Sequence, residues 1–272
     1  MKTSIIVALS LLSLSSFSCK GQPQSSYVKI DTIVFPIKDF KPPQDSVKIN
    51  IQSADTLYYG DTSSVCQADS FYHLTKYVPV KCKLKFTDIK PDKGDSKQKL
   101  CVAAAFTSKE LIYVVGDYVT QGRFVGQEPD VESGYCVIIN GRPVIRPLDN
   151  QVDKYIIRAV ETKGDFFRQM LLIYDYEVVQ CTIFDKYRPT YRRALVEQGK
   201  GQFFVVESEE RISICDFQTM LVKLGVKNAI YLDMGTWSEG FYRDRYNEVV
   251  PIGKQTLSTK HQTNWLVFEQ IK

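Results

Sequence analysis

The sequence has 272 residues, of which 44% are hydrophobic and 24% charged, so it contains enough apolar residues for a sizeable core. The formal net charge of +4 is small and the Lys and Arg residues are scattered, which argues against nucleic-acid binding. The sequence contains no Walker A loop, GxGxxG fingerprint, GxSxG elbow or HExxH pair. These absences disfavour P-loop, dinucleotide-binding, serine-hydrolase and zinc-protease chemistry.

The N-terminal residues 1–19 have the features of a bacterial lipoprotein signal peptide. Lys2 precedes a short apolar run at residues 5–14, and small residues stand immediately before Cys19. The run is too short to span a bilayer stably, and a basic start with a short apolar segment is typical of export. We expect lipidation at Cys19, anchoring to a membrane through the lipid, and a periplasmic or outer-membrane-associated location in the cell envelope. Plain secretion with cleavage nearby is the alternative.

The remainder of the chain is expected to form a polar tether and N-terminal extension over residues 20–45 and a single domain over residues 46–272. Apolar residues alternate with polar ones, or form short runs bounded by turn residues, in many segments, which predicts strands. The predicted strands cover residues 27–30, 33–35, 47–51, 78–86, 100–106, 111–115, 134–145, 156–160, 170–173, 177–184, 201–207, 229–232, 249–252 and 264–268.

Two local signals refine this picture. Asn140-Gly141 between apolar runs predicts a tight hairpin turn, because both residues accept positive φ angles. Ser213 and Asp216 can cap one long amphipathic helix, which Gly225 would end. Many strands with few helices predict an α+β fold with a mixed, strand-rich sheet core.

The cysteines give a weaker signal. Export would permit disulfides, but Cys101, Cys136 and Cys181 lie inside apolar runs, where a free thiol behaves as a small hydrophobe. We expect mostly buried thiols, with Cys66 and Cys82 as the pair if any disulfide forms.

The segment from residue 224 to 243 carries the densest chemistry. Asp233 follows a short apolar run and precedes a turn with Gly235, which is how α/β folds tend to place a functional carboxylate. Upstream, Arg192 and Arg193 supply guanidinium groups that bind phosphate or carboxylate bidentately. Surface ion pairs are the alternative interpretation of these charged residues.

The order of these segments resembles the phosphodiester glycosidase family. Members carry an Arg-Thr-Ala-like segment, a strand, a helix and then Leu-Gly-x-x-x-Ala-x-x-Leu-Asp-Gly-Gly-Gly-Ser. This sequence has Arg192-Arg193-Ala194-Leu195, a strand, a helix, Leu224-Gly225, Asn228-Ala229-Ile230 and Leu232-Asp233. Residues 103–106, Ala-Ala-Ala-Phe, stand where the family has Asn-Gly-Gly-Phe-like residues, and residues 134–144 resemble its strand-Asn-Gly-strand unit.

The sequence also departs from the family pattern. Gly-Gly-Gly-Ser is replaced by Met234-Gly235-Thr236-Trp237, with Ser238 one step later, and the family's Asn falls on Ala103. Fewer glycines make close backbone approach to a ligand less assured.

The resemblance implies an exported glycoside hydrolase-like protein that cleaves sugar 1-phosphodiesters of glycans or envelope polymers. Asp233 would be the catalytic carboxylate, and Arg192 and Arg193 would stabilise the departing phosphate. The residues expected to bind the sugar phosphodiester or glycan are Phe106, Gly235, Thr236, Trp237, Ser238, Glu239, Tyr242 and Arg243. Asp233 with Glu239 could hold a hard divalent cation, and no other cofactor is expected. Because the Asn and glycine positions are altered, a non-catalytic glycan-binding envelope lipoprotein on the same fold is the alternative.

Overall fold

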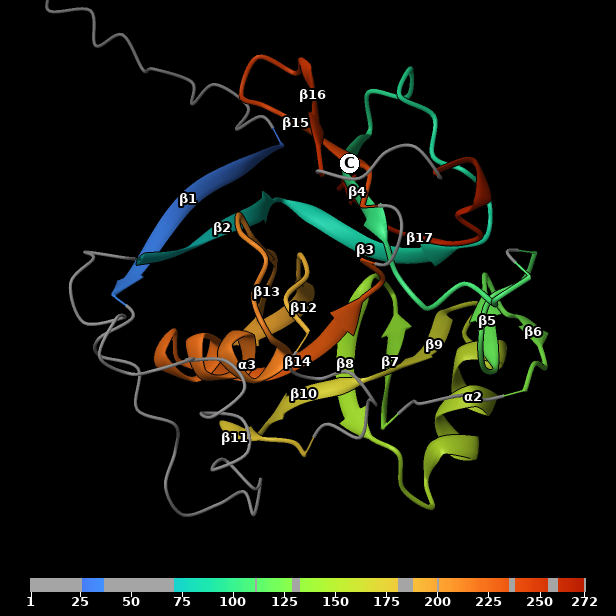
Figure 1. The fold of residues 1–272 in the computed structure, drawn as a ribbon. Coiled ribbons are helices and arrows are strands. Elements are labelled where there is room, and N and C mark those ends of the chain that lie inside the picture. The colour runs from blue at the N-terminus through green and yellow to red at the C-terminus, as the bar shows by residue number, and fades with distance from the viewer. Residues whose placement is uncertain are drawn as a thin grey trace, which may run out of the picture.

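The structure is a computed structural model that describes residues 26–36, 71–110, 112–128, 133–180, 188–199, 201–234, 238–253 and 259–271. Three antiparallel sheets and two α-helices make up this part of the chain (Figure 1). The predicted strand-rich α+β class is therefore confirmed.

The first sheet has seven strands in the order β1-β2-β13-β12-β14-β10-β11. They are β1 (Tyr27–Pro36), β2 (Phe71–Val80), β10 (Leu171–Tyr174), β11 (Glu177–Val178), β12 (Arg193–Gln198), β13 (Gln202–Ser208) and β14 (Val226–Leu232). Although β1 lies inside the predicted tether and N-terminal extension, it pairs with β2 along its whole length. The domain boundary at residue 46 remains a prediction.

The second sheet has the order β16-β15-β4-β17-β3, and the third has the order β6-β5-β9-β7-β8. The second contains β3 (Cys82–Thr87), β4 (Gln98–Ala103), β15 (Gly240–Arg243), β16 (Val249–Ile252) and β17 (Trp265–Gln270). The third contains β5 (Tyr118–Thr120), β6 (Arg123–Val125), β7 (Gly134–Ile139), β8 (Arg142–Pro147) and β9 (Asp165–Gln169). A short 3-10 helix, Thr259–His261, precedes β17.

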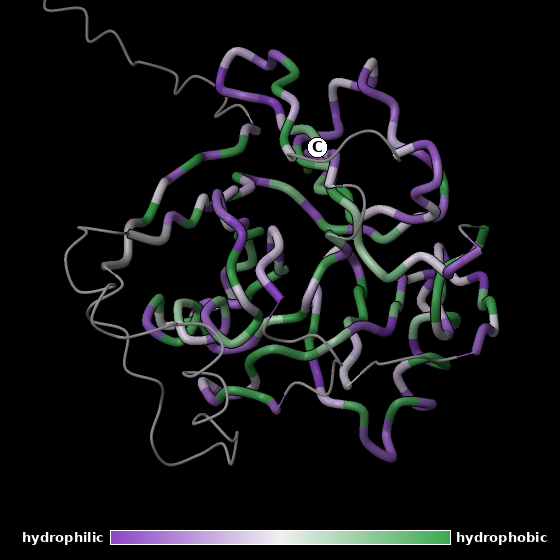
Figure 2. The backbone as a smooth tube through the Cα atoms, viewed as in Figure 1, coloured by the Kyte–Doolittle hydropathy of each residue, from purple (hydrophilic) through white to green (hydrophobic). Residues whose placement is uncertain are grey.

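The main hydrophobic core fills the space among the three sheets. Its members come from all of them, for example Leu195 and Ile230 of the first, Phe86 and Leu100 of the second and Phe167 of the third. Figure 2 shows hydrophobic stretches along these strands, whereas the loop between β3 and β4 is mainly hydrophilic. One core shared by three sheets fixes how their strand ends meet, and this is what positions the candidate site.

Helix α3 (Ile214–Lys223) packs on the outer face of the first sheet (Figure 1). Ser213 Oγ accepts a hydrogen bond from the backbone N–H of Asp216 at 2.9 Å, as its N-cap position predicts. Gly225 has φ +73°, the left-handed conformation that ends many helices. The predicted helix and both of its ends are confirmed.

Helix α2 (Val152–Glu161) corrects the strand predicted at residues 156–160. Ile156, Ile157 and Val160 are β-branched, which favoured a strand, but the buried side is formed at helical spacing around Ala159. Helix α2 covers one face of the third sheet with that side. In this segment the helical spacing of the buried residues outweighs the preference of the β-branched residues for strands.

The strand predicted at residues 78–86 is two strands of different sheets. Lys81 has φ +53° and separates β2 from β3, so the chain turns from the first sheet into the second at this residue. The predicted strand at 111–115 was also wrong, since the described part of it forms only an isolated bridge between Val114 and Thr107. The hairpin at Asn140-Gly141 is confirmed, with φ angles of +52° and +76°.

Cys82, Cys101 and Cys136 carry free thiols, and Cys101 and Cys136 are buried as predicted. Cys82 is therefore not in a disulfide, and Cys19, Cys66 and Cys181 lie outside the described residues. No helix in the described ranges is long and apolar enough to cross a membrane.

Candidate functional site

Asp233 lies where the first and second sheets meet. It follows β14, and its backbone N–H donates to the carbonyl of Ala104, directly after β4, at 2.9 Å. The backbone N–H of Thr107 donates to its carboxylate Oδ2 at 3.3 Å, and Asp233 is only 5% exposed. The ends of two strands from different sheets therefore hold this carboxylate between them.

The segment after β4 that faces Asp233 is itself held by buried amide side chains. Asn264 accepts from the backbone N–H of Ala105 at 2.7 Å and donates to the carbonyl of the same residue at 3.0 Å. Gln169 donates to the carbonyl of Ala104 at 3.4 Å, and the hydroxyls of Thr107 and Thr263 lie 3.0 Å apart. Sequence reasoning missed Asn264, Gln169 and Thr107, because only the fold brings them to residues 104–107.

Tyr231 connects Asp233 with Phe106 and Arg192. It lies two residues before Asp233 in β14, and its ring is 5.9 Å from the ring of Phe106, centroid to centroid. The guanidinium of Arg192 lies 6.0 Å from the Tyr231 ring centroid, and its Nη1 donates to the Tyr231 hydroxyl at 3.4 Å. Burial raises the pKa of Tyr231, an effect that Arg192 opposes and Asp233 reinforces. Arg192 and Phe106 thus both lie beside Tyr231, two residues before Asp233, and the sequence analysis did not single out this tyrosine.

The other nitrogens of Arg192 bind backbone carbonyls. Nε donates to Ile212 at 3.1 Å and Nη2 to Arg188 at 2.7 Å, and the side chain is buried. These bonds fix the position of the guanidinium. They leave its positive charge close to the Tyr231 hydroxyl rather than free at the surface.

Arg193 points into the main core and away from Arg192, because successive side chains of a strand lie on opposite faces. It is completely buried, and its Nε and Nη2 donate to Oε2 of Glu207 at 3.0 and 2.6 Å. Nη2 also donates to the backbone carbonyl of Ser238 at 2.8 Å. In the described part of the chain, Nη1 has no hydrogen-bond partner. Arg193 therefore holds the backbone at Ser238, shortly before β15.

Arg243 lies at the opposite end of the second sheet. Its guanidinium donates to the backbone carbonyls of Gln98, Asn247 and Lys93. Gln98 begins β4 and Ala104 follows its end, so this position is about 20 Å from Asp233 at 3.3 Å per residue. The structure does not bring Arg243 to the carboxylate, because β15 runs away from it.

Glu239 and Tyr242 also make contacts elsewhere. The carboxylate of Glu239 accepts from Nζ of Lys93 at 2.9 Å. Burial would raise the pKa of Glu239, but hydrogen bonds from Lys93 and Thr259 outweigh it and the pKa is lowered. The ring of Tyr242 lies 5.9 Å from that of Tyr77. Both residues contribute to packing around β15.

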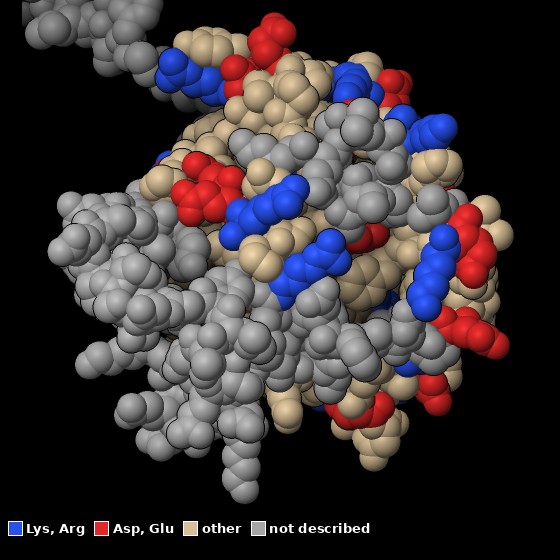
Figure 3. Space-filling model, viewed as in Figure 1, with Lys and Arg blue, Asp and Glu red and all other residues tan. Residues whose placement is uncertain are grey.

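Three of the predicted substrate-binding residues, 235–237, lie outside the described residues, and Ser238 is buried. Over the described ranges, no group of three or more His, Cys, Asp or Glu side chains could hold a metal ion. Charges of both signs are mixed on the face shown in Figure 3. The residues that the structure does bring together are the buried Asp233 and the buried Arg192, with the rings of Tyr231 and Phe106 beside them.

The three antiparallel sheets and two helices define the fold class of the described chain as a strand-rich α+β domain. The catalytic domain of zebrafish N-acetylglucosamine-1-phosphodiester alpha-N-acetylglucosaminidase has a similar structure, with a TM-score of 0.54. The likeness covers 93% of this chain and 85% of that chain at 10% sequence identity, so it shows a distant relationship of fold alone.

A hypothetical protein from Synechocystis is similar over 74% of this chain and 60% of that chain, with 12% identity and a TM-score of 0.48. No family model and no curated protein matches the sequence.

Proposed function

We propose that this protein is an exported, lipid-anchored hydrolase that cleaves sugar 1-phosphodiesters of glycans or envelope polymers. The observation that carries the proposal is the convergence of Asp233, Arg192 and Phe106 at the ends of β14 and β4. The similar fold of a phosphodiester glycosidase domain supports the substrate class. Export and the lipid at Cys19 rest on the sequence pattern alone.

The reaction suits a site with one carboxylate and one cation. A phosphate leaves the anomeric carbon as a stable anion, so the leaving group needs less help from a general acid than an ordinary glycoside, which is cleaved by two carboxylates. Asp233 would orient water or stabilise the oxocarbenium-like transition state. Arg192, linked to the Tyr231 hydroxyl, would stabilise the charge that develops on the phosphate.

The test is release of sugar from a panel of hexose and N-acetylhexosamine 1-phosphodiesters by the purified full-length chain. Asp233→Asn should lower the rate by on the order of 10²–10⁴-fold, the range for a group that acts on protons or water. Asp175→Asn makes the same charge change at an exposed turn residue with φ +49°, a conformation that Asn accepts, and should leave the rate unchanged. A wild-type protein that is inert across the panel would remove the enzymatic proposal.

A non-catalytic glycan-binding lipoprotein is the second candidate, and the burial of both arginines favours it. Arg192 is 5% exposed and Arg193 is not exposed, and most of their nitrogens already bind protein oxygens. Ala103, at the position of the family's Asn, is also buried. This candidate predicts glycan binding without turnover that Trp237→Ala weakens. Absence of binding to any glycan of an array would refute it.

A further inference from the structure

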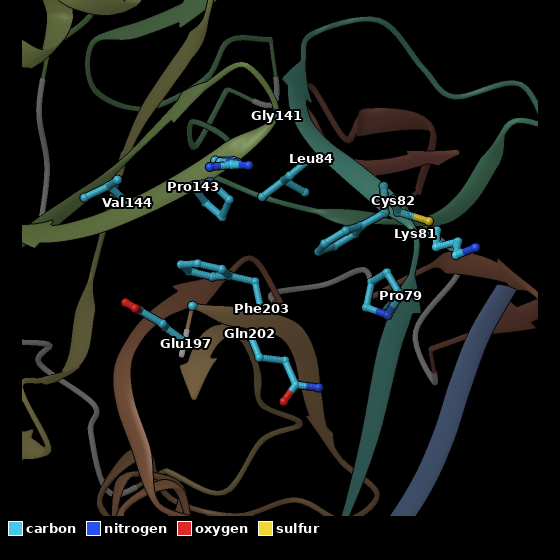
Figure 4. A pocket seen from close by; sticks show the side chains of 13 residues that line it. Pro79, Lys81, Cys82, Leu84, Gly141, Pro143, Val144, Glu197, Gln202 and Phe203 are labelled. Carbon is cyan, nitrogen blue, oxygen red and sulfur yellow. The ribbon is translucent and has the colours of Figure 1, made fainter. Parts of the chain in front are cut away.

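A cavity of about 710 Å³ lies at the end of the first sheet that is opposite to Asp233. Arg193 pairs with Leu232 next to Asp233, whereas Glu197 lines the cavity, about 13 Å further along β12. The walls of the cavity come from β12 and β13, from the β2–β3 corner and from the tip of the β7–β8 hairpin (Figure 4). The volume falls within the range of about 300–1,000 Å³ that is usual for small-molecule sites.

The hairpin wall of the cavity is fixed to β3. The backbone N–H of Leu84 donates to the carbonyl of Gly141 at 3.0 Å. A Cβ on Gly141 would lie 2.4 Å from Cβ of Lys83, so only glycine permits this close approach. The tip of the hairpin is therefore held against the second sheet.

The corner wall is fixed in a similar way. The carbonyl of Lys81 accepts from the hydroxyl of Ser26 at 3.2 Å and from the backbone N–H of Ile271 at 3.0 Å. Because two of the three walls are tied down by backbone contacts, the cavity is largely formed before any ligand binds. A ligand would then have little ordering entropy to overcome.

The inner surface of the cavity offers flat apolar faces. Phe203 extends from the β13 side and Pro143 from the β8 side into the same space (Figure 4). Leu84 and Phe268, both 3% exposed, also line the cavity. Flat aromatic and proline faces favour a ligand with a ring.

The charged groups around the cavity favour an anion. Lys81 and Arg142 are exposed basic residues among those that line it. Among the described residues that line the cavity, Glu197 is the one acidic residue, and its carboxylate accepts a hydrogen bond from Nδ2 of Asn228 at 2.6 Å. In Figure 4 this carboxylate is directed away from Pro143 and Phe203. The carboxylate that could neutralise the two basic side chains is therefore already hydrogen-bonded to Asn228.

We propose that this cavity binds a small amphipathic anion, an aromatic or alicyclic ring that carries one carboxylate. The ring lies between Phe203 and Pro143, and the carboxylate interacts with Arg142, the neighbour of Pro143 in the hairpin, while Lys81 adds positive charge at the β2–β3 corner. The site is separate from Asp233, and the proposal does not depend on the hydrolase activity.

The test uses benzoate, cyclohexanecarboxylate and 2-naphthoate, each paired with its neutral carboxamide, in calorimetric titrations of the full-length chain. At least one carboxylate should bind about fivefold or more tightly than its carboxamide, the ratio for an exposed charge pair of about 1 kcal/mol. Arg142→Glu should remove this preference. Lys154→Glu, an exposed charge reversal on α2, is the matched control and should keep it.

Val144→Trp tests the location of the ligand. Val144 lines the cavity and is 44% exposed, so a larger side chain can enter the cavity without disturbing the core. This variant should abolish saturable binding while circular dichroism and the unfolding midpoint stay unchanged. The proposal is overturned if no carboxylate binds saturably, if acid and amide bind equally, or if folded Val144→Trp binds as tightly as wild type. Unchanged binding by Arg142→Glu would overturn it as well.

Discussion

Replacement of Glu207 by Gln should leave the guanidinium of Arg193 as an unpaired charge inside the protein. Arg193 is 0% exposed and Glu207 4% exposed, and one oxygen of Glu207 accepts two hydrogen bonds from Arg193. Breaking a buried ion pair by removal of one partner costs roughly 3–5 kcal/mol. Gln keeps an oxygen that can accept a bond, so we expect the free energy of unfolding to fall by about 3 kcal/mol, the lower end of that range.

Urea unfolding of the full-length chain measures this change, provided the dependence of the unfolding free energy on urea is the same in both proteins. The control is Asp31→Asn, which breaks the pair between Lys29 and Asp31. Those side chains are 62% and 42% exposed and 3.7 Å apart. The control should cost no more than about 1 kcal/mol, because water screens an exposed pair.

A double-mutant cycle separates the ion pair from other effects. Arg193→Met removes the buried cation, and the double variant with Glu207→Gln should be less destabilised than the sum of the single changes. The expected coupling is roughly 1–3 kcal/mol, as for residues in direct contact. Additive costs, or a Glu207→Gln cost below about 1 kcal/mol, would refute the view that this pair stabilises the fold as a buried charge pair.

Two further predictions concern Asp165 and Gly253. Burial raises the pKa of Asp165 from 3.8 to about 6, so the folded protein binds this proton more tightly than the unfolded chain does. The contribution of Asp165 to the free energy of unfolding is therefore full below about pH 4 and is lost as the pH rises through about 6. Relative to Asp165→Asn, the unfolding free energy of the wild type should fall by up to about 3 kcal/mol between pH 4 and 7, and parallel pH profiles would contradict this. Gly253→Ala places a Cβ 2.0 Å from the Ser238 carbonyl oxygen at φ +99°, whereas Gly201→Ala at φ +69° meets nothing within 4 Å. In thermal melts the free energy of unfolding should fall by about 1–2 kcal/mol for Gly201→Ala and by about 1–3 kcal/mol more for Gly253→Ala. Equal losses for the two variants would contradict the steric overlap expected at residue 253.

The features of the fold that sequence predicts well are those coded within a few residues. Asn140 and Gly141 both accept the positive φ angles that the hairpin turn needs, and the Ser213 hydroxyl caps its helix by binding the backbone N–H of Asp216. The errors came where distant packing decides the local structure. Residues 78–86 alternate as one strand would, but Lys81 directs the two halves into different sheets.

The candidate site was predictable to the same extent. The place of Asp233 at the end of an apolar run and the guanidinium of Arg192 make these two residues candidates from the sequence alone. Asn264 could not be found, because it binds Ala105 across 159 residues and the sequence gives no sign of that contact. Strand alternation predicts that Arg192 and Arg193 point in opposite directions, but the sequence does not say which of them lies beside Tyr231 and which pairs with Glu207.

The place of β17 in the second sheet has a consequence for biosynthesis. This strand pairs with β3 on one side and β4 on the other, yet residues 265–270 follow every other strand of the described chain. As the chain emerges from the ribosome, β3 and β4 lack their common neighbour until residues 265–270 have been made, and the site segment after β4 lacks its Asn264 partner for almost as long. Completion of the second sheet therefore follows the synthesis of every strand of the first sheet.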